Sequence, residues 1–393
     1  MRVLVLSFYY EPDLSAGSFR ATSLVRALRK ERSSNLLIDV VTTQPNRYNT
    51  FDPQASPSER DVGLTIHRIS LPKHSSDMIG QSKAFWRFAV NSIRLTKNVD
   101  YDLVFATSSR LMTAALGALI ARRNQSKLYL DIRDIFVDTM KDILPKGLAA
   151  LLGPVLSALE RWTVGRADRI NLVSAGFAEY FQSRYPRKEF SFFTNGIDDE
   201  FLFDSVAEST AGAKSLLNIV YAGNIGEGQG LHVILPKLAA RLRGRAVFQV
   251  IGDGGRKPAL ERALSAAGVA DLVDIRAPVP RVSLIEAYRG ADVLFLHLND
   301  YEAFKKVLPS KLFEYAAMGK PIWAGVGGYA AKFVESEIPN AAVFRPCDAE
   351  AAESALAALS MRPCVRSEFI QKYSRANIMQ QMARDVLQLL PSG

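Results

Sequence analysis

The chain has 393 residues, of which 48% are hydrophobic and 23% are charged. This composition is ordinary for a globular protein, and it excludes a disordered chain, a collagen and a disulfide-built miniprotein. At about 150 residues per domain, the length indicates two or three domains. The 49 basic and 40 acidic side chains give a formal net charge of +9.

The positive charge is not spread evenly. Residues 1–195 contain 27 basic and 18 acidic side chains, whereas residues 196–393 contain 22 of each. The excess therefore belongs entirely to the first half, which suggests that this half faces phosphate, nucleic acid or an anionic membrane. A basic protein without such a partner has the same count, so charge alone leaves both interpretations open.

Several absences point to a reducing compartment. The two cysteines, Cys347 and Cys364, have no metal-ligand spacing with each other or with the four histidines. The apolar run at the start of the chain is too short for a signal peptide. The longest apolar stretch, residues 147–159, contains Pro154 and is shorter than the ~20 residues of a membrane span. We therefore expect a cytoplasmic protein that touches a membrane peripherally at most.

The first half alternates buried strands with amphipathic helices. Residues 3–7 form a continuous apolar run, typical of a strand buried on both faces, and residues 18–30 follow as an amphipathic helix. The pattern predicts further strands at 36–42, 64–69, 103–106, 127–131 and 169–173, with a helix around 156–164. This alternation is typical of a doubly wound, largely parallel sheet.

The same pattern starts again after a junction near residues 195–215. Strands are predicted at 217–222, 248–252, 273–276, 293–298, 321–325 and 342–344, and a long helix at about 365–390. We therefore predict an α/β protein with two doubly wound, Rossmann-like domains that face each other across a cleft. The domains are residues 1–195 and 196–370, and residues 371–393 form a C-terminal helix that packs back on the first domain.

The most informative segment is VLPSKLFEYAAMGKPIWAG, residues 307–325. Ser310 is predicted to cap a short helix that ends at Gly319. The free amides of the first turn and the charge of Lys311 suit a phosphate, and Glu314 on the same face suits two ribose hydroxyls. A surface pair of Lys311 and Glu314 on an ordinary helix is the alternative that the spacing leaves open.

Two glycine clusters also follow predicted strands of the second half. Residues 221–230 read YAGNIGEGQG, in which Gly223 and Asn224 come directly after a strand, so that the backbone could approach a diphosphate. Residues 252–257 add Arg256 and Lys257, which could meet phosphate oxygens. Neither cluster matches GxGxxG or the P-loop pattern, and plain turns remain an alternative.

In the first half, candidate residues lie at two strand ends. Gly17 closes the loop after the first strand, where backbone could pass close to a phosphate or sugar. Arg133 and Asp134 follow the fifth strand directly after Asp131, and such groups can orient a hydroxyl or stabilise charge. A structural salt-bridge cluster is the alternative. The sequence has no HExxH or HxE metal signature.

Residues 78–97 predict a basic amphipathic helix. Lys83, Arg87, Arg94 and Lys97 form one stripe, and Trp86 lies beside it. Basic and aromatic side chains together suit a helix at an anionic bilayer. A core helix with a solvated basic edge has the same pattern.

Taken together, these segments resemble the large family of retaining glycosyltransferases with the GT-B fold. The similarity rests on FEYAAMGKP at 313–321, supported by FFTNGID at 192–198, YAGNIGEGQG, VIGDGG and ADVLFL. The PSKLFEY and GNIG forms resemble enzymes of bacterial surface-polysaccharide synthesis (O-antigen, capsule) that transfer amino sugars, such as fucosamine transferases. The resemblance implies a nucleotide-sugar donor, no metal and no other cofactor.

The resemblance also implies roles for individual residues. Gly17 would approach the donor phosphate, Ser310 and Lys311 would lie at the diphosphate, Glu314 would hold the ribose, and Val279 would meet the base through its backbone. Arg133 and Asp134 would lie near the acceptor and are the candidate catalytic residues. Three positions depart from the family pattern: Lys306 replaces a Glu, Asn224 replaces an Arg, and Gln229 replaces a Lys. Lys306, Lys311 or Arg256 would have to replace the two missing cations.

The resemblance thus implies transfer of a sugar from a nucleotide diphosphate donor, UDP-linked, to a lipid-linked saccharide, and with the basic first half it suggests a protein bound peripherally to the inner face of the cytoplasmic membrane. No nucleic-acid motif occurs. A nucleotide-sugar epimerase on the same scaffold and a catalytically inactive scaffold protein remain alternatives.

Overall fold

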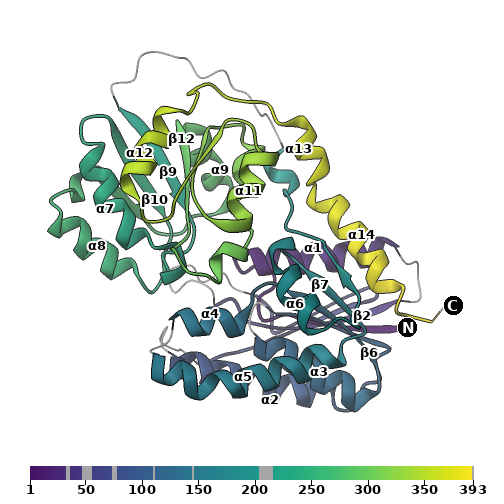
Figure 1. Cartoon of the computed structure of the whole chain (residues 1–393). Coiled ribbons are helices and arrows are strands. Elements are labelled where there is room, and N and C mark those ends of the chain that lie inside the picture. Colours follow the sequence, from purple (N-terminus) through teal and green to yellow (C-terminus); the bar gives the residue numbers. More distant parts are fainter. Residues whose placement is uncertain are drawn as a thin grey trace. The chain divides into compact units, whose positions relative to one another are not determined.

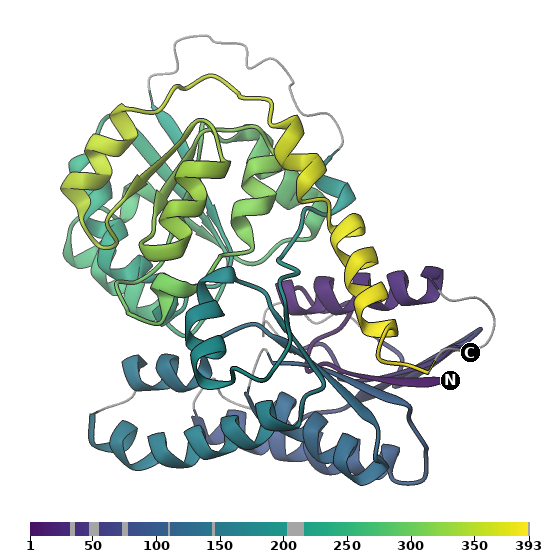
Figure 2. The same cartoon turned by 45° about the vertical axis from the view of Figure 1, so that its right-hand side comes forward.

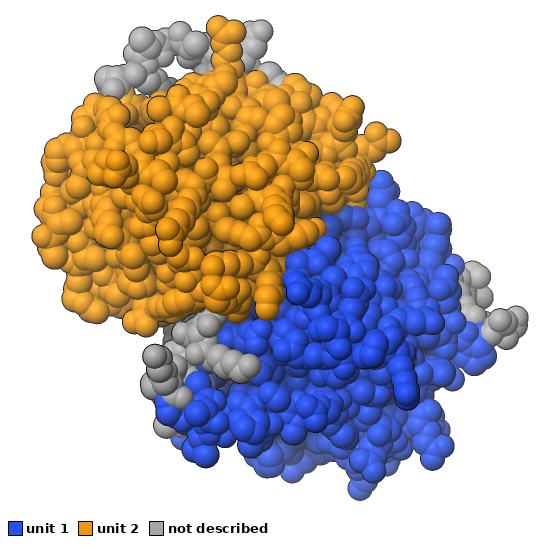
Figure 3. All heavy atoms as spheres, viewed as in Figure 1, with its two compact units in different colours: residues 1–195, 376–393 blue, residues 196–375 orange. Residues whose placement is uncertain are grey.

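A computed structural model describes residues 1–31, 36–46, 55–72, 78–108, 111–143, 146–202 and 216–391. The chain forms two compact units, shown in different colours in Figure 3. Unit 1 contains residues 1–195 and 376–393, and unit 2 contains residues 196–375. Most of the predicted junction, residues 203–215, lies outside the described residues.

The described part of unit 1 contains an eight-stranded sheet in the order β3-β4-β2-β1-β5-β6-β7-β8. All neighbouring strands are parallel except β3 and β4. The strands are β1 (Arg2–Leu6), β2 (Leu37–Thr43), β3 (Ser58–Asp61), β4 (Leu64–Ile69), β5 (Leu103–Thr107), β6 (Lys127–Ile132), β7 (Arg169–Leu172) and β8 (Phe190–Ser191).

Helices cover both faces of this sheet. Figures 1 and 2 show α1 and α14 on one face and α2, α3 and α5 on the other. Strand β1 is buried from Val3 to Leu6, as a central strand covered on both sides must be. The helices are α1 (Ala16–Glu31), α2 (Met78–Thr96), α3 (Leu111–Asn124), α4 (Phe136–Ile143), α5 (Lys146–Arg166), α6 (Ala178–Arg184) and α14 (Arg375–Leu387).

Unit 2 has a wholly parallel sheet in the order β11-β10-β9-β12-β13-β14. Its strands are β9 (Leu217–Ala222), β10 (Ala246–Ile251), β11 (Val273–Arg276), β12 (Val293–His297), β13 (Ile322–Gly325) and β14 (Ala341–Phe344). Its helices are α7 (Leu231–Arg241), α8 (Lys257–Ala266), α9 (Arg281–Gly290), α10 (Lys311–Ala317), α11 (Gly328–Glu337), α12 (Ala349–Ala357) and α13 (Ser367–Lys372). The two Rossmann-like α/β sheets confirm the predicted fold class.

The predicted elements differ from the structure at three places, which are one helix break and the unpredicted strands β3 and β8. The predicted helix at 365–390 is two helices, because the backbone leaves the helical conformation at Tyr373 (φ −110°, ψ 22°) and Ser374 forms a β-bridge with Ile197. Strand β3 was not predicted, because its sequence Ser-Glu-Arg-Asp is entirely polar and exposed and so carries no hydrophobic alternation.

Residues 376–393 lie in unit 1 with the predicted first domain, whereas residues 371–375 lie in unit 2. The added segment brings one Arg and one Asp, so unit 1 retains the whole excess of +9. In the parts of the chain that the structure describes, no helix is both long enough and apolar enough to cross a membrane.

Candidate functional site

In unit 2, the strand order changes direction between β9 and β12, since β10 and β11 extend the sheet on one side and β13 and β14 on the other. Ligands of open α/β sheets bind beyond the carboxyl ends of the strands at such a point. The loops that leave β9 and β12 touch there, because the Asn299 amide donates to the Gly228 carbonyl over 2.8 Å. Most candidate donor residues lie on these two loops or on α10.

The structure brings Lys311 and Gly223 together. A Cβ atom on Gly223 would lie 2.1 Å from both Cε and Nζ of Lys311, and the φ of Gly223 is +141°. The positive φ favours glycine at this position, and the end of the Lys311 side chain occupies the space where a Cβ would lie. The Lys311 ammonium also lies 5.6 Å from the centre of the Tyr221 ring. The cation of α10 is thus placed directly over the glycine loop.

The loop's two amide side chains bind each other. Asn224 Nδ2 donates to Gln229 Oε1 over 2.9 Å, and the Gly226 amide donates to the same oxygen over 3.3 Å. Asn224 and Gln229 are the two positions at which the family that this sequence resembles carries cations. Here they form an uncharged, hydrogen-bonded pair within the loop. Any positive charge that contacts a diphosphate must therefore come from residues outside this pair.

His297, at the end of β12, binds the backbone of this loop at Gln229. It is fully buried, its Nδ1 lies 2.7 Å from the Gln229 carbonyl oxygen, and its Nε2 accepts the Cys347 amide over 2.9 Å. This arrangement requires a neutral ring with the proton on Nδ1. Burial lowers the pKa of His297 to about 4, which keeps the ring neutral in ordinary buffers.

Arg256 precedes α8, and its backbone amide donates to the Ile225 carbonyl over 2.9 Å. Its guanidinium is paired with Glu227, whose other carboxylate oxygen accepts the Tyr301 hydroxyl over 2.6 Å. Partial burial tends to raise the pKa of Glu227, but the hydrogen bond from Tyr301 and the charge of Arg256 outweigh it and lower that pKa. Arg256 therefore lies at the loop, but its charge is already engaged.

The start of α10 does not have the predicted side-chain cap. Ser310 occupies the N-cap position, but its side chain makes no capping hydrogen bond. Its backbone is already helical (φ −61°, ψ −28°), whereas a side-chain cap requires an extended backbone at that residue. The prediction of Ser310 as a side-chain cap is therefore wrong.

Glu314 is half-buried on α10, and its carboxylate accepts no hydrogen bond from the residues that the structure describes. Burial raises its pKa, against the opposing charges of Arg281, Lys311 and Arg375. Both of these arginines form ion pairs with Asp198, and Arg281 also pairs with Glu200 at 2.7 Å. Glu314 is thus surrounded by cations without being hydrogen-bonded to them.

The remaining donor-side candidates lie on neighbouring segments. Val279 is half-buried in the loop between β11 and α9, two residues before Arg281. Lys306 ends the short helix η5 (Phe304–Lys306), five residues before Lys311. Gly17 is the second residue of α1 and belongs to unit 1.

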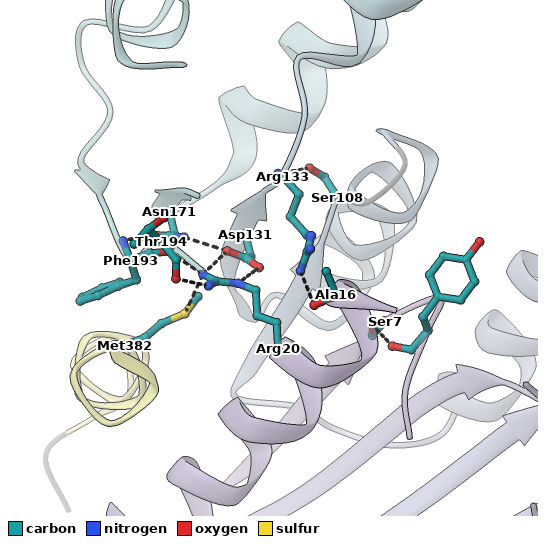
Figure 4. Close-up of polar contacts among 11 residues, drawn as sticks. Ser7, Ala16, Arg20, Ser108, Asp131, Arg133, Asn171, Phe193, Thr194 and Met382 are labelled. Carbon is teal, nitrogen blue, oxygen red and sulfur yellow. Dashed lines mark hydrogen bonds and ion pairs between the residues drawn. The ribbon is translucent and has the colours of Figure 1, made fainter. Parts of the chain in front are cut away.

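The carboxyl edge of the unit 1 sheet holds a buried ion pair, which Figure 4 shows. Arg20 of α1 binds Asp131 of β6 through two hydrogen bonds of 2.8 and 2.9 Å. The same guanidinium donates to the carbonyls of Phe193 and Thr194, both over 2.7 Å. Asn171 of β7 adds a 2.8 Å bond to Asp131. A charge pair this deeply buried is stable only when its hydrogen bonds are satisfied in this way.

Arg133 and the start of α1 meet beside this pair (Figure 4). The Arg133 guanidinium donates to the Ala16 carbonyl over 3.3 Å, and its amide donates to Ser108 Oγ over 3.2 Å. Gly17 is therefore next to the residue that Arg133 contacts. Asp134 accepts a 3.1 Å bond from Thr139 of α4, and burial raises its pKa.

Sequence reasoning missed Arg20, although a signal was present. Arg20, Leu24 and Leu28 are spaced by four residues and all lie on the buried side of α1. A charged residue on the apolar stripe of a helix indicates a buried partner. That partner, Asp131, is 111 residues away in the chain.

Comparison with known proteins matches each unit to a glycosyltransferase family model. Residues 16–196 match the family model described as "Glycosyl transferase 4-like domain", and residues 217–361 match "Glycosyl transferases group 1". Together the two models account for most of the chain. The protein belongs to the glycosyltransferases of the GT-B fold.

Among its relatives in this glycosyltransferase family, an Escherichia coli K12 protein, WcaI, is 24% identical over 336 residues, which are 81% of this chain and 82% of the relative. The name of that relative assigns it to colanic acid biosynthesis as a glycosyl transferase.

Solved structures share the fold. Sucrose-phosphate synthase of Thermosynechococcus elongatus aligns with a TM-score of 0.74 at 15% identity, over 99% of this chain and 98% of that one. HepE of Anabaena, in complex with UDP-glucose, aligns with a TM-score of 0.68 at 14% identity, over 99% of this chain and all of that one. At such identities these likenesses concern the fold of this glycosyltransferase and not its substrate.

Proposed function

We propose that this glycosyltransferase moves a sugar, an N-acetylated amino sugar, from a UDP-linked donor to a lipid-linked saccharide with retention of anomeric configuration. The reaction would serve a bacterial surface polysaccharide, an O-antigen or capsule. The name of the WcaI relative and the UDP-glucose in the HepE structure are consistent with this proposal. The observation that carries it is Glu314, a half-buried carboxylate with no hydrogen-bond donor at the carboxyl edge of a parallel sheet.

Glu314 is suited to a ribose. A carboxylate offers two acceptor oxygens, and the neighbouring 2′- and 3′-hydroxyls of a nucleoside are two donors with matching separation. Bound hydroxyls would supply the hydrogen bonds that this buried carboxylate lacks in the free protein, and those bonds favour its charged form. Val279, in the loop that leads to Arg281, would meet the base through its backbone.

Lys311 is the cation that we assign to the diphosphate. It lies over Gly223, so a diphosphate on the glycine loop would meet both the loop's backbone and the ammonium. In the transfer, an acceptor hydroxyl forms a bond to the anomeric carbon as the bond from that carbon to the β-phosphate oxygen breaks. The hydroxyl proton passes to the departing diphosphate, whose growing charge Lys311 stabilises.

On the acceptor side, we propose that Arg133 and Asp134 bind the acceptor saccharide. Asp134 is half-buried with a raised pKa, and Arg133 is held at the start of α1. These are groups that can orient a hydroxyl. We further propose that the reaction needs no metal ion, and transfer that is unchanged in EDTA would support this.

The test begins with thermal unfolding of the full chain against UDP, UDP-linked amino sugars and other nucleotide sugars, because a ligand of the folded state raises its stability. UDP affinity is then measured by calorimetry for Glu314→Gln. The amide keeps one acceptor oxygen but loses the negative charge and the second acceptor, which is expected to weaken UDP binding by about tenfold to a hundredfold. Glu335→Gln, an exposed carboxylate in the interior of α11, is the matched control and should bind UDP as the wild type does.

If Glu314→Gln binds UDP with unchanged affinity, the assignment of this site is wrong. With the donor identified, incubation without acceptor separates the remaining alternatives. Release of an epimerised free sugar would indicate an epimerase, and no turnover with any acceptor would indicate an inactive scaffold protein.

A further inference from the structure

Helix α5 begins with a long apolar stretch that the protein does not bury. Residues 147–159 have no charged side chain, and none of them is fully buried. Leu151 is 71% exposed, Val155 65% and Leu148 38%. Their spacing of three and four residues places them on one side of the helix. A surface helix ordinarily turns its polar side outward, so an outward apolar stripe indicates a partner.

The two neighbouring helices share this property. Helix α3 packs against both α2 and α5, and Figures 1 and 2 show the three helices together on one face of the unit 1 sheet. Trp86 of α2 is 71% exposed, and Met112 and Leu119 face outward from α3. Of the ten exposed large hydrophobic side chains in the described part of unit 1, seven lie on these three helices.

The charge of these three helices is almost entirely positive. Their sequences contain eight basic residues and one acidic residue, Glu160, which is buried. Lys83, Arg87 and Arg94 are exposed on α2 around Trp86, and Arg122 and Arg123 are exposed at the end of α3. Most of the +9 of unit 1 is therefore concentrated on the helices that expose the apolar side chains.

We infer that the outer face of α2, α3 and α5 docks onto an anionic lipid bilayer, with the Leu148–Leu151–Val155 stripe inserted among the lipids and the basic side chains at the headgroups. Apolar area and cations together are what an anionic membrane surface attracts. A second copy of the chain would bring the same positive charge to this face and be repelled. The inference rests on the proposed lipid-linked acceptor and names the surface that would reach it.

The test uses the full chain with two kinds of vesicle, phosphatidylcholine alone and phosphatidylcholine with one quarter phosphatidylglycerol, in flotation at low and high salt. We expect binding only to the anionic vesicles, with loss at high salt. Leu151→Ser/Val155→Ser should weaken vesicle partitioning by about tenfold or more for each side chain. Lys83→Gln/Arg87→Gln/Arg94→Gln should weaken it by a similar factor. Val62→Ser, 89% exposed on the β3–β4 turn, is the matched control and should bind normally.

Trp86 reports insertion directly. Its emission should shift to the blue on anionic vesicles and be quenched by brominated acyl chains, and Trp86→Phe should remove that signal. Three results would overturn the inference. One is a wild type that does not float with anionic vesicles at low salt, and another is equal weakening by Val62→Ser. The third is a wild-type dimer that the Leu151→Ser/Val155→Ser variant loses.

UDP affinity, measured on the same proteins, separates this inference from the proposed function. Variants that lose vesicle binding and retain UDP support the docking surface. A wild type that binds vesicles and no nucleotide would leave the surface standing while the proposed donor site fails. A wild type that binds UDP and no vesicle would do the reverse.

Discussion

The two sheets place charged residues at their carboxyl ends in opposite ways. In unit 1, Arg20 and Asp131 are buried and bind each other, with main-chain carbonyls taking further donors of the guanidinium. In unit 2, Glu314 has cations around it but accepts no hydrogen bond from the described residues. The side chain of Lys311 on α10 lies against Gly223 of the glycine loop. A satisfied charge pair stabilises the fold, whereas a desolvated carboxylate without donors is a candidate for ligand binding.

The largest expected effect on this difference between the two units comes from replacing Arg20. Arg20→Met leaves the Asp131 charge buried without its partner, which is expected to cost about 3–5 kcal/mol of the unfolding free energy of unit 1. Urea unfolding monitored by circular dichroism measures this loss. UDP affinity should change little, since Glu314 and Lys311, the residues proposed to bind the ribose and the diphosphate, lie in unit 2.

Arg26→Met is the matched control for Arg20→Met. Arg26 lies on the same helix and pairs with Glu11 at 2.7 Å, but both side chains are exposed, so its loss should cost less than about 1 kcal/mol. Equal destabilisation by the two variants would mean that the buried pair has no special role.

His297 gives the next largest effect. Its folded pKa of about 4 lies below the ordinary value of 6.5, so the unfolded chain binds the proton first as the pH falls. The contribution of the neutral His297 ring to the unfolding free energy is therefore fully present above pH 6.5. It falls by about 2 kcal/mol between pH 6.5 and pH 5. Thermal unfolding across this range should show a shallower pH slope for His297→Gln.

The raised pKa of Glu314 predicts a pH dependence of ligand binding. The carboxyl takes up its proton at a higher pH than an ordinary glutamate, and a protonated carboxyl loses an acceptor for the ribose. UDP affinity should therefore fall, by up to about tenfold, as the pH is lowered toward the usual glutamate range. Calorimetry of Glu314→Gln should lack this component. Identical pH profiles for the two proteins would contradict the role of Glu314.

Gly17 gives the smallest expected effect on stability. A Cβ there would meet Ser15 Oγ at 3.7 Å and Tyr9 Cδ2 at 3.9 Å, which are ordinary contacts. Gly17→Ala should therefore fold with stability within about 1 kcal/mol of the wild type. If Gly17 approaches the donor phosphate, the rate of UDP release from the donor sugar should fall severalfold. A rate equal to that of the wild type would remove Gly17 from the site.

Much of the fold could be predicted because the signals are local. A strand covered on both faces is a continuous apolar run, and runs such as 3–7 and 217–222 alternate with helical segments in both halves. The position of Glu314 relative to Lys311 also follows from helical spacing alone. The polar strand β3 and the break between α13 and α14 were missed, because neither has a hydrophobic period.

The sequence alone therefore determined two Rossmann-like units, the surplus of positive charge in the first, and the strand ends where chemistry should lie. Tertiary structure decided which charges are partners. Arg20 of α1 meets Asp131 of β6 across 111 residues of the chain, and the Gln229 whose side chain binds Asn224 is also held through its carbonyl by His297. It also decided that the apolar start of α5 stays exposed. Hydrophobic periodicity is read within a few residues, whereas burial and pairing depend on contacts between segments far apart in the chain.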